Sequence, residues 1–475
     1  MMYSIEILAA FDFLPKEMLI GTLEYERLKG NASFRFSYNQ EFLLRFPSLS
    51  LSADLGNFPG IQTGLENLFS FLGDALPDRW GRALIDKRER MEAKTVGKIP
   101  RVFDDFGYLV RIDDFSRMGA LRFKYNGRYL GLDNEKCNVP PVTDLDSFIR
   151  EAQMIEEAER KNLPYQKAWI DNVWKPGSSL GGARPKLNVI DEDENLLIAK
   201  IPSVKDTYDV GLWEHFACHL AKKAGINVAE SRVLRIGPTP FHTLLTKRFD
   251  RNRDKRIHFA SSLTLTGLKD GDNASNSKGY IDIIDAMAGS IGVNSLSGNT
   301  TELFRRVAYN ILIGNHDDHF RNHGFLLRPD GWQLSPAYDL NPTNEKTQVL
   351  AITPYSNSSS LKELYESSEY LLSNGMATIL SWENGISRLR RGRPAQPALT
   401  KALRPPGTVA CKPHLKMVNR PVLWKKCLEI PQTMYIFGMY AIMTTRDVLY
   451  NKVARILMAS GQGPTLHTIS RGGQQ

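Results

Sequence analysis

The sequence lacks the features that mark secreted and membrane-spanning proteins. Its four cysteines, Cys137, Cys218, Cys411 and Cys427, are scattered and form no C-x-x-C pair. This spacing predicts neither a disulfide framework nor a zinc site, and it favours a reducing cytoplasm as the location. No apolar run approaches the roughly 18 residues that a membrane helix needs. We expect no signal peptide, because Glu6 interrupts the first apolar run and no basic stretch precedes it.

Acidic residues are scarce in the last part of the chain. From Arg388 to Gln475 there are 15 Lys and Arg but two acids, whereas the preceding residues carry 46 bases and 50 acids. Residues 391–475 are also rich in proline and show no sustained apolar period. We predict an atypical basic tail there, partly disordered. Such a tail is typical of an arm that binds nucleic acid or of a solvated appendage without a specific partner.

What is present fits a globular protein of two or three domains. The chain has 475 residues, of which 42% are hydrophobic and 24% charged. In the first 125 residues, alternation predicts strands at Met18–Tyr25, Ala32–Tyr38 and Leu109–Ile112, and helical spacing predicts helices at Glu66–Leu72 and Arg82–Arg88. The motif FLGDALPDRWG joins these helices and predicts a turn around Trp80. Nothing in this block has catalytic spacing, which favours a structural or partner-binding use.

A glycine-rich stretch, KPGSSLGGARPK, precedes a predicted β-hairpin. Its backbone N–H groups could wrap phosphates. The hairpin strands are Leu187–Ile190 and Leu196–Ile201, and Lys200 lies on the second. A P-loop would continue directly into G-K-[ST] and a helix, which this chain does not. The alternative is an ordinary glycine-rich surface hairpin with a solvated lysine. The helix predicted upstream at Asp144–Asn162 would bridge two domains.

The segment after the hairpin predicts a helix at Trp213–Ala224, ended by Gly225, and then two antiparallel strands. Glu214 lies in the first turn of the helix, where the helix dipole favours an acid. It could instead pair with Lys200 and hold that lysine against phosphates. The second strand, Thr243–Phe249, ends in a segment that could form a hinge and border an adenine.

The most informative stretch is ILIGNHDDHFRNHGFLLRPDGWQLSPAYDLNP at 311–342. Asp317 and Asn322 are five residues apart, as in the kinase catalytic loop H-R-D-x-x-x-x-N, and Asp339 lies where a second metal-binding acid would fall. Carboxylate and amide oxygens suit Mg²⁺ bound together with a triphosphate. The segment before it, 280–313, predicts helices. Val349–Thr353 predicts a strand, and Leu361–Leu372 and Met376–Leu389 predict helices.

The histidines of this stretch allow two other hypotheses. His316, His319 and His323 could bind zinc, although Asp317 stands where the zincin pattern needs Glu, and the neighbouring glycines favour a loop over a helix. The His316–Asp317 pair also suits a phosphodiesterase-like metal site, but further histidines at metal-binding spacing are absent upstream. We interpret His319 as a residue that orients Asp317 or a phosphate.

Several of these motifs, in this order, resemble the HipA family of serine/threonine kinases, the toxins of bacterial toxin–antitoxin pairs. They are SLGGARPK at 179–186, Lys200 in IAKIP, KRFDR at 247–251, GNHDDHFRNHGFLL at 314–327 and SPAYDLNP at 335–342. The block with FLGDALPDRWGR also resembles the first subdomain of that family. The resemblance covers roughly residues 15–387.

The resemblance implies an α+β, protein-kinase-like fold of two lobes. It implies an N-terminal β-rich subdomain at 1–125, a kinase N-lobe at 126–250 and a mostly helical C-lobe at 251–390, ahead of the tail at 391–475. ATP and Mg²⁺ would be the cofactors. Asp317 would be the catalytic base, and Asn322 and Asp339 the metal ligands. The nucleotide would be bound by Gly181, Gly182, Ala183, Arg184, Pro185, Lys186, Lys200, Glu214, Lys247, Arg248, Phe249, His319 and Tyr338.

The resemblance also implies regulation and partners. Ser179 occupies the position at which family members inactivate themselves by autophosphorylation. A small, HipB-like helix-turn-helix antitoxin would be the partner and would bind DNA, and an aminoacyl-tRNA synthetase is a known substrate of the family. Two alternatives stay open: a catalytically impaired regulator that binds antitoxin and DNA without turnover, and a small-molecule kinase.

Overall fold

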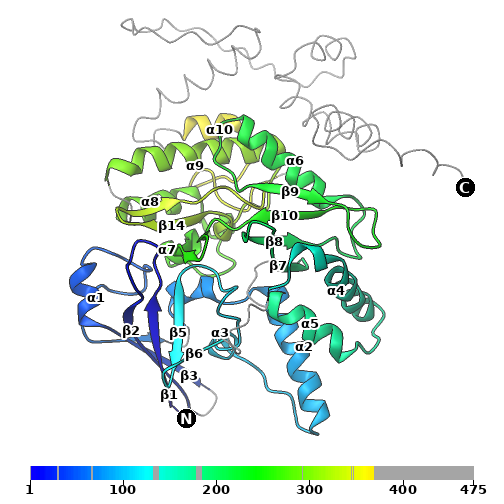
Figure 1. Cartoon of the computed structure of the whole chain (residues 1–475). Helices are drawn as coiled ribbons and strands as arrows, with labels where there is room; N and C mark the ends of the chain where they lie inside the picture. The colour runs from blue at the N-terminus through cyan, green and yellow to red at the C-terminus, as the bar shows by residue number, and fades with distance from the viewer. Residues whose placement is uncertain are drawn as a thin grey trace, which may run out of the picture. The chain divides into compact units, whose positions relative to one another are not determined.

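Four β-sheets and the helices between them make up the described part of the chain (Figure 1). The computed structural model describes residues 2–28, 31–65, 68–131, 139–177, 184–290, 293–343, 345 and 347–367. All of them belong to one compact unit, Met1–Gly375. The predicted helix at Met376–Leu389 and the basic tail lie outside the described residues.

A six-stranded antiparallel sheet forms the N-terminal module, with strand order β4-β3-β2-β1-β5-β6. The strands are β1 (Met2–Ala9), β2 (Met18–Leu28), β3 (Asn31–Tyr38), β4 (Ile61–Leu65), β5 (Leu121–Tyr125) and β6 (Arg128–Tyr129), with α1 (Gln40–Arg45) after β3. Phe34, Phe36 and Tyr38 alternate into the core, so the two predicted N-terminal strands are confirmed. The predicted strand at Leu109–Ile112 is wrong. Asp104 caps a short helix there, α3 (Asp105–Leu109), by accepting from the Gly107 N–H.

The FLGDALPDRWG motif does not form a turn around Trp80. It runs from a 3₁₀ helix, η1 (Ser70–Ala75), into α2 (Arg79–Thr95), which begins at the N-cap Asp78 and contains Trp80 in its first turn. Two further helices, α4 (Leu145–Arg160) and α5 (Lys167–Gly177), follow a 3₁₀ turn at Val142–Asp144. Helix α5 packs against both α2 and α4. Helix α4 confirms the helix predicted at Asp144–Asn162.

The second sheet has four antiparallel strands in the order β7-β8-β10-β9. They are β7 (Lys186–Ile190), β8 (Leu196–Lys200), β9 (Ser231–Leu234) and β10 (Thr243–Lys247). Helix α6 (Val210–Lys223) packs on β9 and β10 (Figure 1). The predicted hairpin and the predicted helix after it are therefore confirmed. The apolar residues of this sheet form one core with α2, α4 and α5.

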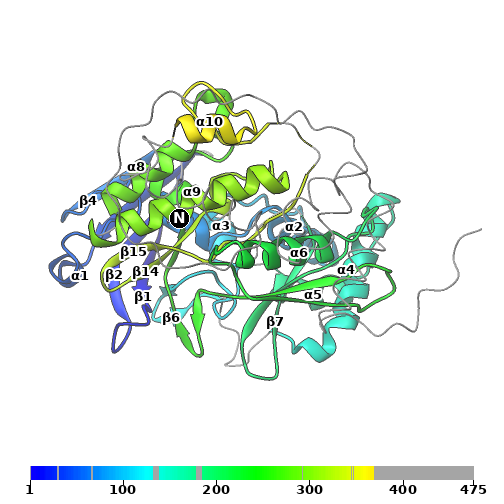
Figure 2. The ribbon, with the colours of Figure 1, turned by 90° about the horizontal axis from the view of Figure 1, so that it is seen from above.

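The remaining described residues are mostly helical. A short hairpin, β11 (Arg251–Asn252) with β12 (Lys255–Arg256), leads to a three-stranded sheet of β13 (Phe259–Ser261), β14 (Gly324–Arg328) and β15 (Gly331–Leu334). The helices are α7 (Ser262–Thr266), α8 (Tyr280–Ser290), α9 (Val293–Ile313) and α10 (Leu361–Glu366), with 3₁₀ turns η3 (Ala274–Asn276) and η4 (Phe320–Asn322). Both α8 and α10 pack on α9, as Figure 2 shows.

Two expectations for this part have different outcomes. The helices predicted at 280–313 are confirmed. The strand predicted at Val349–Thr353 is wrong, because the segment makes isolated bridges, Gly279 to Ala351 and Thr353 to Ser356, and no ladder. None of the helices within the described ranges combines the length and the apolar character needed to cross a membrane. The fold is α+β, with a β-rich N-terminal module, a lobe built on the four-stranded sheet and a mostly helical lobe.

Candidate active site

A cleft of about 200 Å³ lies where the four-stranded sheet, the three-stranded sheet and the N-terminal module meet. Its walls contain most of the residues that the sequence singles out. From that set the lining includes Lys186, Lys200, Glu214, Lys247, Arg248, Phe249, His319, Asn322, Tyr338 and Asp339. Residues that lie up to 153 positions apart in the sequence are thereby gathered at one site.

Lys200 stands at the centre of the charged side of the cleft. Its Nζ atom lies 2.5 Å from Glu214 Oε1 and 2.5 Å from Asp339 Oδ1. Burial alone would lower the pKa of Lys200, but the two carboxylates outweigh burial and raise it. The pairing of Glu214 with Lys200 that the sequence suggested is therefore confirmed, although α6 begins at Val210 and Glu214 lies beyond its first turn.

The pKa values of the two carboxylates in this cluster shift in opposite directions. Burial raises the pKa of Glu214, despite Lys200, because its side chain is only 4% exposed. Burial also acts against the charged form of Asp339, but Lys200 and Lys186 lower its pKa well below the ordinary range. Asp339 is consequently the stable anion of the cluster at neutral pH.

A second lysine, Lys186, faces the same cluster from the neighbouring strand. It is the cross-strand partner of Lys200 in the β7–β8 pair. Burial and the charge of Lys200 lower the pKa of Lys186. Two lysines and two acids thus form a group of roughly balanced charge on one wall of the cleft.

The loop after α9 carries Asp317 and Asn322. The Asn322 side chain donates through Nδ2 to the Asp317 carbonyl oxygen at 3.0 Å, which fixes the direction of the amide. Asp317 is an exposed residue, yet partial burial of its carboxyl, together with Asp339 and Asp318, raises its pKa against the opposing effect of His319. The charge of Asp339 is thus one cause of the raised pKa of Asp317, although Asp317 itself does not line the cleft.

Asp318, which sequence reasoning did not single out, holds this loop in place. Its side chain is buried and accepts hydrogen bonds from Tyr280 (2.7 Å), Asn310 (2.8 Å) and His323 Nε2 (3.0 Å). These donors lower the pKa of Asp318 in spite of burial. In the sequence, the only indication of this role is that Asp318 directly follows Asp317. Its partners on α8 and α9 could not be predicted from residue spacing.

Asp339 occupies a strained backbone conformation. Its φ angle is +57°, in the left-handed region that non-glycine residues rarely adopt. Asn341 Nδ2 donates to Asp339 Oδ1 at 2.9 Å, and Lys200 binds the same oxygen. Strain of this kind costs on the order of 1–3 kcal/mol and gathers at functional sites.

The opposite wall of the cleft is aromatic. Phe249 follows β10 and packs against Tyr338, with ring centroids 5.5 Å apart, and against Phe259 at 6.0 Å. The Tyr338 hydroxyl donates to the Arg321 carbonyl oxygen at 2.5 Å, which fixes the ring. An apolar wall beside a short connecting segment suits a flat base, as the sequence suggested for Lys247 and Phe249.

Arg248 does not offer its charge to the cleft. Its guanidinium is buried and binds Asp250, Asn188 Oδ1 at 2.9 Å and the Ser116 carbonyl oxygen at 2.5 Å. Asp250 in turn accepts from the Gly119 N–H at 2.8 Å. Arg248 nevertheless lines the cleft, so the nucleotide contact expected at this position stays a prediction that concerns its backbone and not its guanidinium. That side chain fastens the segment between the lobes to the N-terminal module.

Of the glycine-rich loop, the structure describes the last residues, from Arg184 onward. Ser179, Gly181, Gly182 and Ala183 lie outside the described residues. Arg184 and Pro185 are described and do not line the cleft. The Arg184 guanidinium binds Asp206, and the Pro185 carbonyl oxygen accepts from the Ile201 N–H at 3.0 Å.

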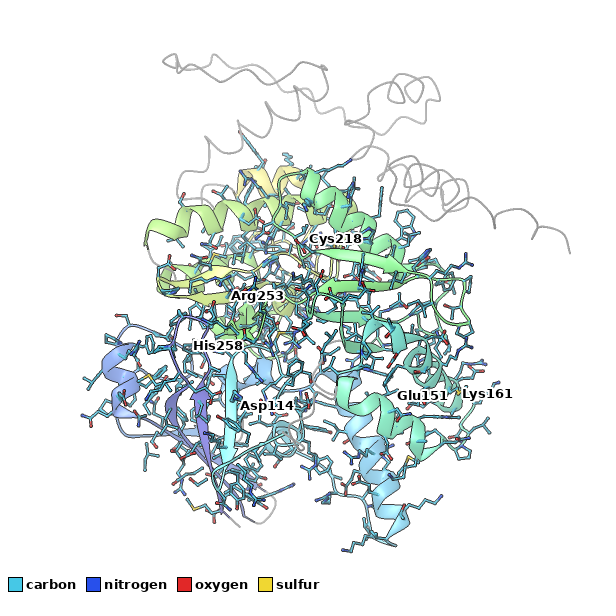
Figure 3. All side chains as sticks on the ribbon, in the orientation of Figure 1. Asp114, Glu151, Lys161, Cys218, Arg253 and His258 are labelled. Carbon is cyan, nitrogen blue, oxygen red and sulfur yellow. The ribbon has the colours of Figure 1, made fainter. Side chains whose placement is uncertain are left out.

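The N-terminal module contributes to the cleft, which sequence reasoning missed. Gly73, Asp74, Leu76 and Asp78 from the η1–α2 corner line it. Cys218 of α6, labelled in Figure 3, also lines the cleft, and burial raises the pKa of its thiol to about 12, which keeps the thiol protonated at neutral pH. The FLGDALPDRWG block, for which the sequence predicted a structural or partner-binding use, therefore also lines the cleft.

The three histidines of the catalytic stretch have separate environments. His316 Nδ1 faces Thr343 Oγ1 at 3.1 Å, and His323 Nε2 faces Asp318. Within the described ranges, no three His, Cys, Asp or Glu side chains are grouped as ligands of one metal ion. The segment is a loop and not a helix, so the geometry does not support the zinc hypothesis.

The residues present do suit Mg²⁺ bound together with a triphosphate. Asn322 and Asp339 both line the cleft and carry the oxygen atoms that Mg²⁺ prefers, and Mg²⁺ usually takes one or two carboxylates plus phosphate oxygens. The two lysines beside them supply positive charge for the phosphates.

The chain is similar to several known proteins. Residues 178–383 match the family described as HipA-like C-terminal domain. The chain is 24% identical over 257 residues to the serine/threonine-protein kinase toxin HipA of Shewanella oneidensis, covering 49% of this chain and 55% of that protein. The chain thus spans about half the length of this curated relative.

Two solved structures are similar to the chain. The Shewanella oneidensis complex of HipA, HipB and operator DNA matches at 20% identity with a TM-score of 0.51, covering 83% of this chain and 92% of that one. At that identity the match shows the fold. The Helicobacter pylori kinase CtkA matches 44% of this chain and 82% of that one, at 15% identity and a TM-score of 0.32, which is too low to support an argument.

Proposed function

Because the chain is a HipA-family protein, we propose that it is an ATP- and Mg²⁺-dependent protein serine/threonine kinase acting in the cytoplasm as the toxin of a toxin–antitoxin pair. The observation that carries this proposal is the cluster of Lys200, Glu214 and Asp339. It links both lobes at the base of a cleft that also holds Asn322 and an aromatic wall.

The residues divide the chemistry between them. Phosphoryl transfer needs alignment and charge neutralisation more than covalent help. Lys200 would hold the phosphates and Glu214 would hold Lys200. Asp317, whose raised pKa brings it closer to neutrality, would accept the proton of the substrate hydroxyl. Mg²⁺, when bound by Asn322 and Asp339, would neutralise charge on the phosphates. Phe249 and Tyr338 would border the adenine.

The proposed partners follow from the relatives. The similar solved assembly contains HipB and operator DNA, and on that basis we propose a HipB-like helix-turn-helix antitoxin, with DNA bound indirectly. An aminoacyl-tRNA synthetase is the proposed type of protein substrate. Ser179 is the proposed site of inactivating autophosphorylation.

Replacement of Asp317 by Ala tests the proposal directly. Transfer of labelled phosphate from ATP to protein should fall by roughly 10²–10⁴-fold, the usual contribution of a general base. The matched control is Asp330→Ala, which removes an exposed carboxylate from the β14–β15 turn and should leave transfer unchanged. Equal activity of Asp317→Ala and the wild-type protein, with both folded, would disprove the assignment.

The alternative is a regulator that binds the nucleotide, antitoxin and DNA without turnover. The basic composition of residues 391–475 favours this second function, because such a segment can bind DNA. Calorimetric titration with ATP and Mg²⁺ separates the two: binding without any phosphate transfer supports the regulator. Transfer to a small molecule, and to no protein, would instead support a small-molecule kinase.

A further inference from the structure

The base of the glycine-rich loop meets a tryptophan from a distant part of the chain. Trp80 lies in the first turn of α2 and is 5% exposed. Its indole Nε1 donates to the Lys186 carbonyl oxygen at 3.1 Å, across 106 residues of sequence. Lys186 begins β7, directly after the loop. The bond therefore fixes the point at which the loop enters the sheet.

The other end of the loop reaches the same tryptophan. The loop leaves α5 at Gly177, the last residue of that helix. A Cβ atom at Gly177 would lie 2.8 Å from Leu84 Cδ1, 3.2 Å from the Lys186 carbonyl oxygen and 3.3 Å from Trp80 Nε1. A side chain at 177 would thus enter the space that the hydrogen bond occupies. The two ends of the loop consequently converge on α2.

The start of α2 is itself held from two sides. On the side of the four-stranded sheet, Trp80 and Leu84 share one buried core with residues of α5 and β7, and α2 packs along α5 (Figure 1). On the other side, Asp74, in the preceding corner, accepts from the Ser261 N–H at 2.6 Å and from Thr264 Oγ1 at 2.7 Å. A rigid support of this kind transmits small displacements.

We infer that Trp80 is a positioning residue for Lys186, at the base of the glycine-rich loop, acting from the start of α2 through the Lys186 carbonyl. The inference deepens the proposed function and rests on it. Trp80 is not among the residues that line the cleft, so its effect passes through the loop and the Lys186 side chain. Trp80 belongs to the FLGDALPDRW motif, so this motif has a role at the cleft that the spacing of the predicted kinase residues does not indicate.

The first experiment compares two Trp→Phe variants of the full chain. Trp80→Phe keeps an aromatic ring and removes the N–H donor. Trp332→Phe is the matched control, because Trp332 is equally buried and its Nε1 donates to the Ser50 carbonyl oxygen at 3.0 Å, away from the loop. Trp80→Phe should weaken calorimetric binding of ATP with Mg²⁺, and raise KM for ATP, by roughly 3- to 10-fold, the equivalent of one neutral hydrogen bond. Its kcat should change less than KM.

Hydrogen exchange supplies a readout that does not require catalysis. Peptides that span 177–187 should exchange faster in Trp80→Phe than in the wild-type protein, and at the wild-type rate in Trp332→Phe. Unchanged nucleotide affinity together with unchanged exchange in Trp80→Phe would overturn the inference. If the wild-type chain binds no ATP, the proposed function fails, while the exchange comparison still decides whether Trp80 holds the loop.

A pair of glycine variants covers the case in which Trp80→Phe does not fold. Gly177→Ala introduces the Cβ that meets Leu84 and the Lys186 carbonyl, whereas Gly289→Ala adds a Cβ with no atom within 4 Å. Gly177→Ala should reproduce the loss of ATP affinity and the faster exchange at 177–187, and Gly289→Ala should show neither. Wild-type behaviour of Gly177→Ala in both measurements would contradict the inference.

Discussion

Replacement of Lys200 by Met separates the structural from the catalytic role of the charge cluster. The change removes the cation that lies 2.5 Å from each of two carboxylates. Breaking one member of a buried ion pair costs about 3–5 kcal/mol. Asp339 is 31% exposed and therefore partly screened by solvent, whereas Glu214 is 4% exposed. Most of the cost therefore falls on Glu214, and we expect about 3 kcal/mol.

The assay is thermal unfolding alongside phosphate transfer. At about 2 °C per kcal/mol for a domain of this size, Lys200→Met should lower Tm by roughly 6 °C. Transfer should fall by roughly 10²–10³-fold, as on removal of a group that stabilises transition-state charge. The double variant Lys200→Met/Glu214→Gln removes the uncompensated acid. It should recover most of the Tm and none of the activity.

The stability of the single variant and that of the double variant should also depend differently on pH. The pKa of Glu214 is raised in the folded protein, so between about 4.5 and that raised value the folded state binds more protons than the unfolded state. The stability of Lys200→Met should therefore improve as pH falls from 8 to 5, and the double variant should lack this improvement. Equal Tm values for the single and double variants at neutral pH would refute the reasoning.

Four further predictions concern other parts of the chain. Burial lowers the pKa of His258 from 6.5 to about 3, so as pH falls the unfolded chain binds a proton before the folded protein does, and the free energy of unfolding decreases between these two values. His258→Phe should therefore reduce the pH dependence of the free energy of urea unfolding by up to about 1.4 kcal/mol per pH unit. Asp250→Asn breaks a buried ion-pair network and should cost about 3 kcal/mol, against little change for the exposed control Asp254→Asn. Intact mass after incubation with ATP should rise by one phosphate in the wild-type chain and not in Ser179→Ala, and a phosphate at another residue would count against that site. Deletion of 391–475 should leave ATP binding intact if the tail is an appendage, whereas insoluble protein would show that it belongs to the fold.

Local patterns predicted the elements around the cleft. The two short apolar runs Leu187–Ile190 and Leu196–Ile201 predicted the hairpin β7–β8, because their apolar side chains are buried in the core. The amphipathic spacing in 213–224 produced α6 for the same reason. Lys200 lies on β8 and Glu214 on α6, so once both elements were predicted their pairing could be predicted as well. The Asp317 and Asn322 spacing placed both in one loop.

Long-range contacts set the limit of sequence reasoning. The Trp80 bond to Lys186 and the Arg248 bond to the Ser116 carbonyl span 106 and 132 residues, and no periodicity encodes such pairs. Leu109–Ile112 has the apolar composition of a strand, but the side chain of Asp104 caps a helix immediately before it. Local propensity was overridden in each case by a contact that a single sequence does not display.

The indoles of Trp80 and Trp332 join the first third of the chain to opposite lobes, the latter across 282 residues. A replacement of the N-terminal sheet in this chain must therefore preserve both tryptophan–carbonyl seams together with their apolar surroundings. Chimaeras spliced at the sequence boundary alone would join foreign surfaces at these seams.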